Sequence, residues 1–171
     1  MGFSEYLPSG VARALRNVVT VFVPQRAPEL PKNLSDEKKM DVLFSALSFR
    51  PTVISGDSGG WVLSNIGVET GEVGSKVILR YRRDSGTVLT LEEESVHGPR
   101  SSAVFYDVDD TTTTEVTIRG NKISILYHKS GQVNVWWIEQ DLALHLSGQS
   151  SVDTATDFIV RLVPYSGRHG N

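Results

Sequence analysis

The sequence of 171 residues contains no cysteine. This absence excludes disulfide bonds, thiolate zinc sites and a cysteine nucleophile, but it leaves the cellular compartment open. An excess of charge is also lacking, because 17 basic residues stand against 20 acidic ones, and we therefore expect no nucleic-acid partner. Long apolar runs are missing too: Val18 to Val23 is far shorter than the roughly 20 residues that a bilayer crossing needs.

The chain length fits a single domain. Pro24, Pro28 and Pro31 predict an extended linker, because proline lacks an N–H group and restricts the residue before it. We therefore divide the chain into an N-terminal segment and linker at 1–34, one α+β domain at 35–165 and a disordered tail at 166–171. Within the first segment, residues 9–23 begin like a helix and continue as a β-branched run, so that both structures remain open for them.

Alternating apolar side chains predict a series of strands. After a strand from Trp61 to Val68, a hairpin turns at Asp84-Ser85-Gly86, with Gly86 where a positive φ is needed. Its register puts five apolar residues on one face: Val77, Leu79, Tyr81, Leu89 and Leu91. Ser101 to Tyr106 is a further predicted strand, and Asp107 to Thr114 is predicted to be a polar loop.

Two more hairpins follow. A turn at Gly120-Asn121 would pair Ile118 with Ile123 and Val116 with Ile125. A turn at Glu139-Gln140 would pair Trp137 with Leu142, Val135 with Leu144 and Val133 with Leu146, so that each pair is apolar.

Two helices frame the strands. Ser35 caps the first, in which Met40, Leu43, Phe44 and Leu47 form one stripe. Ser150 or Ser151 caps the second, which runs through Ala155, Phe158 and Leu162 and stops at Pro164. We predict an α+β fold in which both helices pack on a curved antiparallel sheet of about seven or eight strands.

The sequence Gly56-Asp-Ser58-Gly-Gly60 matches the surroundings of the nucleophile in chymotrypsin-like proteases. All four histidines follow Ser58, however, whereas in that family the histidine and aspartate precede the serine. We interpret the stretch as a glycine-rich turn and retain a hydrolase using Ser58 as a weaker alternative.

Acidic clusters give no stronger signal. Asp107, Asp109 and Asp110 lack the spacing of a calcium loop, and Glu92 and Glu94 are expected to pair with arginines across the strand. We predict no catalytic residues, no metal and no cofactor.

The polar face of the late hairpins offers a candidate binding surface. His145, Asn134, Trp136 and Ile138 share this face, and Arg80 and Arg82 belong to the polar face of the earlier hairpin. Two large apolar groups on a polar face imply a covering element, such as the N-terminal helix, or a partner surface. We favour the covering helix and keep the six residues as candidate ligand or partner contacts.

The order of these signals resembles the DUF4367 family. The resemblance rests on Leu47-Ser-Phe49-Arg-Pro51, Gly60-Trp61-Val-Leu63, Val77-Ile-Leu79-Arg-Tyr81, Leu89-Thr-Leu91-Glu-Glu93, Val116-Thr-Ile118-Arg-Gly120, Val135-Trp-Trp137 and Leu144-His-Leu146-Ser-Gly148, followed by the helix to Leu162. Such domains stand on the outer side of the bacterial membrane in anti-sigma-factor-like regulators and lipoproteins, and are similar in shape to LolA-like carriers. The zinc-binding anti-sigma domain is absent here, so sigma-factor binding is not implied.

The resemblance implies a non-enzymatic, extracytoplasmic sensory or regulatory domain that binds a protein or an envelope component. The alternative is a LolA-like carrier or sensor of a lipid or other apolar ligand. Residues 7–23 are similar to juxtamembrane stretches, which suggests an ectodomain whose natural full-length protein is membrane-anchored. The oligomeric state is left open.

Overall fold

The computed structural model describes residues 36–71, 74–96 and 110–167. Their elements in chain order are α2 (Asp36–Phe44), β1 (Thr52–Ile54), β2 (Trp61–Gly71), β3 (Gly74–Arg83), β4 (Val88–Ser95), β5 (Thr111–Ile118), β6 (Asn121–His128), β7 (Gln132–Glu139), β8 (Leu142–Gln149), α3 (Val152–Val160) and β9 (Leu162–Pro164). The predicted α+β class is confirmed.

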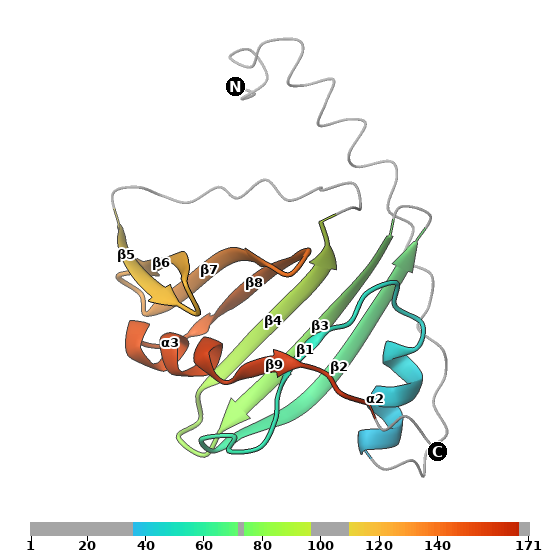
Figure 1. Ribbon diagram of the computed structural model, residues 1–171. Helices are drawn as coiled ribbons and strands as arrows, with labels where there is room; N and C mark the ends of the chain where they lie inside the picture. Colours follow the sequence, from blue (N-terminus) through green and yellow to red (C-terminus); the bar gives the residue numbers. More distant parts are fainter. Residues whose placement is uncertain (1–35, 72–73, 97–109, 168–171) are drawn as a thin grey trace, which may run out of the picture.

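Seven strands form one antiparallel sheet in the order β2-β3-β4-β8-β7-β6-β5. The sheet is curved and open, and α3 lies across one face near the strands β5 to β8 (Figure 1). The short strands β1 and β9 form a second, two-stranded sheet that crosses the same face over β3 and β4, while α2 lies beside β2. One helix before the strands and one after them were both expected.

The core lies between the sheet and these covering elements. We call the buried side of the sheet the inner face and the opposite side the outer face. Phe158 of α3 contacts two aromatic rings of the inner face edge-on, Trp61 with centroids 5.1 Å apart and Tyr81 with centroids 5.2 Å apart. Burial alternates along each central strand, and the fully buried residues include Val77, Leu79, Leu89, Leu91, Ile125, Val133, Val135 and Leu146. The period-2 pattern therefore sorted the two faces correctly.

The C-terminal helix begins as predicted and ends earlier. The Ser151 hydroxyl accepts a hydrogen bond from the Thr154 N–H at 3.1 Å, which is an N-cap. The helix ends at Val160, and Leu162 lies opposite Ile54 in the β1–β9 pair. The expected continuation of the helix through Leu162 was wrong because the chain there pairs with a strand.

The hairpin of β3 and β4 has the predicted register. Tyr81 lies opposite Leu89 and Leu79 opposite Leu91. The Gly86 N–H donates to the Arg83 carbonyl at 2.9 Å, and Gly86 has φ of +85°, so the three-residue loop is confirmed.

Both later hairpins keep the predicted faces but differ from the predicted register by two residues. Ile118 pairs with Asn121, and Trp137 pairs with Leu144. The turns are Arg119-Gly120 and Gln140-Asp141, and all four of these residues have positive φ, as a type I′ turn requires. A two-residue shift leaves every side chain on its face, so the alternation of apolar residues could not exclude it.

Some predictions lie outside the described residues: the segment and linker at 1–34, the Ser35 cap, the strand from Ser101 to Tyr106 and most of the tail. The polar loop was wrong for residues 111–114, which belong to β5. Within the described ranges, none of the helices is long and apolar enough to cross a membrane.

Candidate functional site

The outer face carries a row of residues that crosses the sheet from strand to strand. His145 of β8 lies between Glu92 of β4 and Trp136 of β7. Beyond Trp136 the row continues with Ser124 of β6 and Glu115 of β5. Alternation places all five side chains opposite the buried core.

Trp136 and His145 form the centre of this row. Their rings are parallel within 4° and their centroids lie 4.5 Å apart. This separation is close to the spacing of neighbouring strands, about 4.8 Å, so the rings face each other along the direction that joins the strands. The stack leaves both residues partly buried on the outer face.

The surroundings of His145 lower its pKa and so favour the neutral imidazole. Burial lowers the pKa of His145, the Glu92 carboxylate raises it, and the Lys76 ammonium lowers it again. His145 Nδ1 lies 4.0 Å from Glu92 Oε1, and Glu92 forms an ion pair with Lys76. The arginine partner expected for Glu92 was therefore wrong, since Lys76 on β3 occupies the diagonal position.

Four of the six predicted contact residues lie together. Asn134, Trp136 and Ile138 succeed one another on the outer face of β7, and His145 stands beside them on β8. The register puts Arg80 in the same row as Asn134 but three strands away, which is roughly 14 Å. Arg82 lies farther along β3, opposite Val88 and Val62, and both arginines therefore belong to another part of this face.

The helix expected to cover Trp136 and Ile138 packs elsewhere. Leu43 and Phe44 of α2 belong to the buried core, and the Phe44 ring meets Tyr165 edge-on at 4.9 Å. Ile138 is 54% exposed. The alternative interpretation, a surface that is free for a partner, therefore agrees with the exposure of this side chain.

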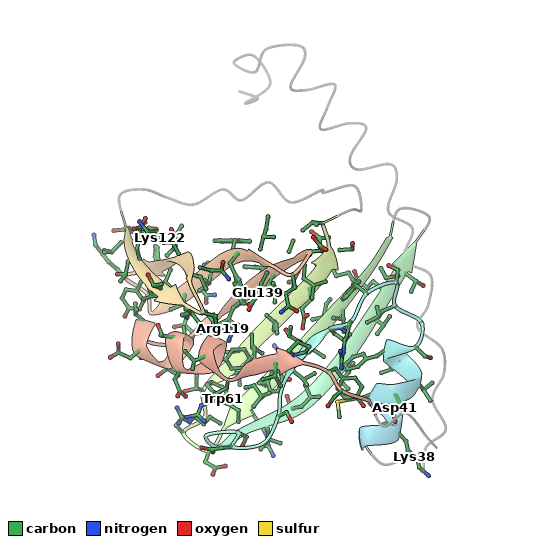
Figure 2. The ribbon with its side chains drawn as sticks, viewed as in Figure 1. Lys38, Asp41, Trp61, Arg119, Lys122 and Glu139 are labelled. Atoms are coloured by element: carbon green, nitrogen blue, oxygen red, sulfur yellow. The ribbon has the colours of Figure 1, made fainter. Side chains whose placement is uncertain are left out.

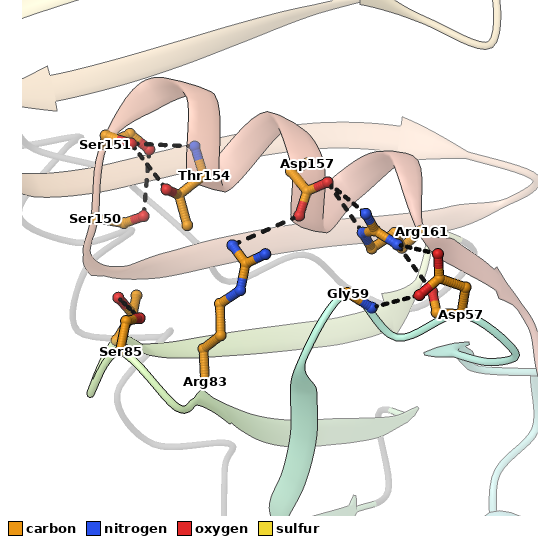
Figure 3. A network of polar contacts seen from close by, with 10 residues as sticks. Asp57, Gly59, Arg83, Ser85, Ser150, Ser151, Thr154, Asp157 and Arg161 are labelled. Atoms are coloured by element: carbon orange, nitrogen blue, oxygen red, sulfur yellow. Dashed lines mark hydrogen bonds and ion pairs between the residues drawn. The ribbon is translucent and has the colours of Figure 1, made fainter.

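The loop around Ser58 is anchored by charged groups (Figure 3). Arg161, just after α3, donates to the Asp57 carbonyl at 2.9 Å and to Asp157 Oδ1 at 3.0 Å. The Gly59 N–H donates to Asp57 Oδ1 at 3.1 Å, and a Cβ on Gly59 would lie 2.5 Å from the Arg161 guanidinium carbon. Ser58 contributes its carbonyl to the Trp61 N–H at 3.1 Å. These contacts hold the loop against the end of α3.

Buried Glu93 is a residue that the sequence reasoning missed. Glu93 is fully buried on the inner face, and its Oε2 accepts a hydrogen bond from the Thr52 N–H at 2.8 Å. The Ile54 N–H donates to the Tyr81 hydroxyl at 3.2 Å. The Tyr165 N–H donates to the Pro51 carbonyl, so the backbone of residue 51 faces the strand that pairs with β1. Successive residues of a strand direct their N–H groups to alternate sides, and the N–H groups of Thr52 and Ile54 therefore point away from β9. Two inner-face side chains thus hold β1 on the sheet.

Burial raises the pKa of both side chains that hold β1 on the sheet. It raises the pKa of Glu93 from 4.5 to about 8, although the Thr52 N–H acts in the opposite direction. It also raises the pKa of Tyr81 to about 12. Glu93 Oε1 has no hydrogen-bond partner among the described residues. The alternation that buries Leu89 and Leu91 also buries position 93, and this was the available signal.

Arg119 was also missed. From the turn after β5 it binds Glu139 through two hydrogen bonds, both 2.7 Å, and its Nη1 donates to carbonyls at the end of α3 (Figure 2). The Arg119 guanidinium lowers the pKa of Glu139. Positively charged side chains favour helix C-termini, so this residue joins two hairpins to α3.

No group of three or more potential metal ligands gathers within the described part of the chain. Of the three aspartates that were considered as a calcium loop, Asp110 lies in the described part of the chain, and it forms an ion pair with Lys129.

The fold and the outer-face site define an α+β domain with an open antiparallel sheet, one face packed and the other face carrying an aromatic patch. The chain belongs to the family described as a domain of unknown function, DUF4367, whose profile matches residues 64–159, more than half of the chain. The predicted family is thereby confirmed. No curated protein matches the chain.

Proposed function

We propose that this chain is a non-enzymatic, extracytoplasmic sensory or regulatory domain that binds a protein or another envelope component through the outer face of its sheet. The contact surface is the outer patch, defined as Asn134, Trp136, Ile138 and His145. The exposure of Ile138 beside the stacked Trp136 and His145 is the observation that supports this proposal most directly.

The outer patch has the composition of an interface centre. Tryptophan is enriched among the residues that dominate binding energy, and charged residues are depleted at such centres. The four side chains come from two adjacent strands, so the backbone ladder fixes their spacing before a partner arrives. A preformed surface loses little conformational entropy on binding.

Photo-crosslinking in intact cells tests the proposal. A photoreactive amino acid at Ile138 in the natural full-length protein should form an adduct with a specific protein or envelope component, and Trp136→Ala should abolish this adduct. The matched control position is Val62, which is 52% exposed on the same face but lies on β2. If Ile138 yields no adduct, or one that persists with Trp136→Ala, the outer patch is not the contact surface.

The extracytoplasmic placement has its own test. An enzyme reporter that is active only outside the cytoplasm, fused after residue 171 of the full-length protein, should be active. A reporter that works only in the cytoplasm should be silent at the same position, and the reverse result would overturn the placement.

A LolA-like carrier or sensor of an apolar ligand is the competing proposal, because exposed apolar side chains such as Ile138 and Val62 would also suit a lipid. Native mass spectrometry of unheated protein separates the two. A co-purifying lipid whose amount falls with Trp136→Ala supports the carrier, and a bare mass supports the protein partner. A hydrolase would instead show ester or peptide cleavage that Ser58→Ala abolishes.

A further inference from the structure

His145 covers one face of the Trp136 indole, and the register shows what lies beside the other face. One side of the indole stacks on His145, and the stack requires that the other side faces β6, where the directly opposite residue is Ser124. Ser124 is small and exposed, and the next residue of the row is Glu115 on β5, which is also exposed. We call the space between Trp136 and Glu115, above Ser124, the Trp136 notch.

The strand spacing sets the width of this notch. Trp136 and Glu115 stand on strands that are two spacings apart, or about 9 to 10 Å. A planar group stacked on the indole would lie about 3.5 to 4 Å from the ring, so a carboxylate on the far side remains within reach. Only the Ser124 side chain stands between the two walls in this row. The spacing of the strands therefore matches one flat group between Trp136 and Glu115.

Both walls favour a cation. The face of an indole is the negative end of the ring quadrupole, and tryptophan is the strongest cation–π partner among the aromatic residues. Within the described ranges Glu115 forms no ion pair. A cation–π contact joins Arg83 to Trp61 on the opposite side of the sheet. Lys122, two residues before Ser124 on β6, is the nearest basic residue along that strand. Lys122 lies opposite Thr117 and therefore diagonally from Glu115, and among the described residues the two side chains form no ion pair.

We propose that the Trp136 notch binds the guanidinium group of an arginine side chain on the protein partner. The inference rests on the proposed function, because it names the chemistry that the outer face recognises. A guanidinium is planar, stacks on aromatic faces and donates in the plane to a carboxylate, whereas an ammonium is a compact and strongly hydrated charge. Arginine is also enriched at protein interfaces.

NMR titration of the full chain with N-acetyl-arginine amide, at constant ionic strength, tests this site. The backbone amides of Ser124 and Glu115 are the reporters. We expect saturable shifts with a dissociation constant on the order of ten millimolar for this isolated side chain. N-acetyl-citrulline amide, which has the same shape without the charge, should give shifts at least about threefold weaker.

Variants assign the two walls separately. Trp136→Leu should abolish saturation, and Glu115→Gln should weaken binding about two- to fivefold. Glu94→Gln removes a carboxylate from the outer face of β4 and should leave the titration unchanged. Equal shifts with the citrulline compound would overturn the arginine site. An affinity in Trp136→Leu and Glu115→Gln equal to that of the parent would also overturn it. The Ile138 crosslink is independent of Glu115, so its persistence in such a case would show that the proposed function survives without this site.

Discussion

Glu93→Gln should remove a large pH dependence of the protein's stability. The carboxyl group is fully buried, and burial raises the pKa of Glu93 from 4.5 to about 8 in the folded state. Between these values the folded protein keeps the proton while the unfolded chain has released it. The free energy of unfolding therefore falls as pH rises from 4.5 through 8, and it is unaffected by this group at lower pH.

The size of the effect follows from the shift. One pKa unit corresponds to about 1.4 kcal/mol, so a change from 4.5 to about 8 amounts to about 5 kcal/mol at alkaline pH. Local release of β1 would let water reach the carboxylate, which makes this figure an upper limit. Glutamine keeps the shape and an oxygen that accepts from the Thr52 N–H, but it does not ionise.

Urea denaturation from pH 5 to pH 9 measures the difference between the parent and Glu93→Gln. We expect similar stabilities at pH 5 and a variant that is more stable by several kcal/mol at pH 9. Glu94→Gln, on the opposite face of the same strand, should keep the slope of the parent. Parallel profiles for the parent and Glu93→Gln would refute a protonated, buried carboxyl group at this position.

Three further predictions concern turns and the outer face. Arg119→Asn should cost about 1 to 2 kcal/mol of unfolding free energy although asparagine suits the positive φ, and a double-mutant cycle with Glu139→Gln should show coupling. Thermal unfolding should show that Gly59→Ala destabilises the protein more than Gly56→Ala. Both positions have positive φ, which costs an alanine about 1 to 2 kcal/mol, but only at Gly59 would the added Cβ meet the Arg161 side chain. His145 should titrate below pH 6.5 by NMR. Because its pKa is lowered in the folded protein, the free energy of unfolding should fall as the pH decreases below 6.5, and His145→Gln should remove this dependence.

The sequence determined which face of the sheet each central strand residue occupies. Val135 and Trp137 are buried while Trp136 is only partly buried, because successive side chains on a strand point in opposite directions whatever the partner strand is. The same rule brought Asn134, Trp136, Ile138 and His145 to one surface. The Ser151 cap and the three-residue loop at Gly86 were also local, since each depends on the chemistry of a few adjacent residues.

Tertiary structure alone decided the register of the late hairpins and the place of α2. A shift of two residues keeps every face, so only the backbone conformations of Arg119-Gly120 and Gln140-Asp141, together with the contacts of Arg119 to Glu139 and α3, select the observed pairing. Strands β1 and β9 have three residues each, too few for a pattern. Glu93 and Tyr81 of the inner face accept the free N–H groups of β1, and β9 pairs with β1. Alternation is a property of one strand, whereas register, burial of a charge and helix placement depend on groups that are distant in the chain and meet only in the folded protein.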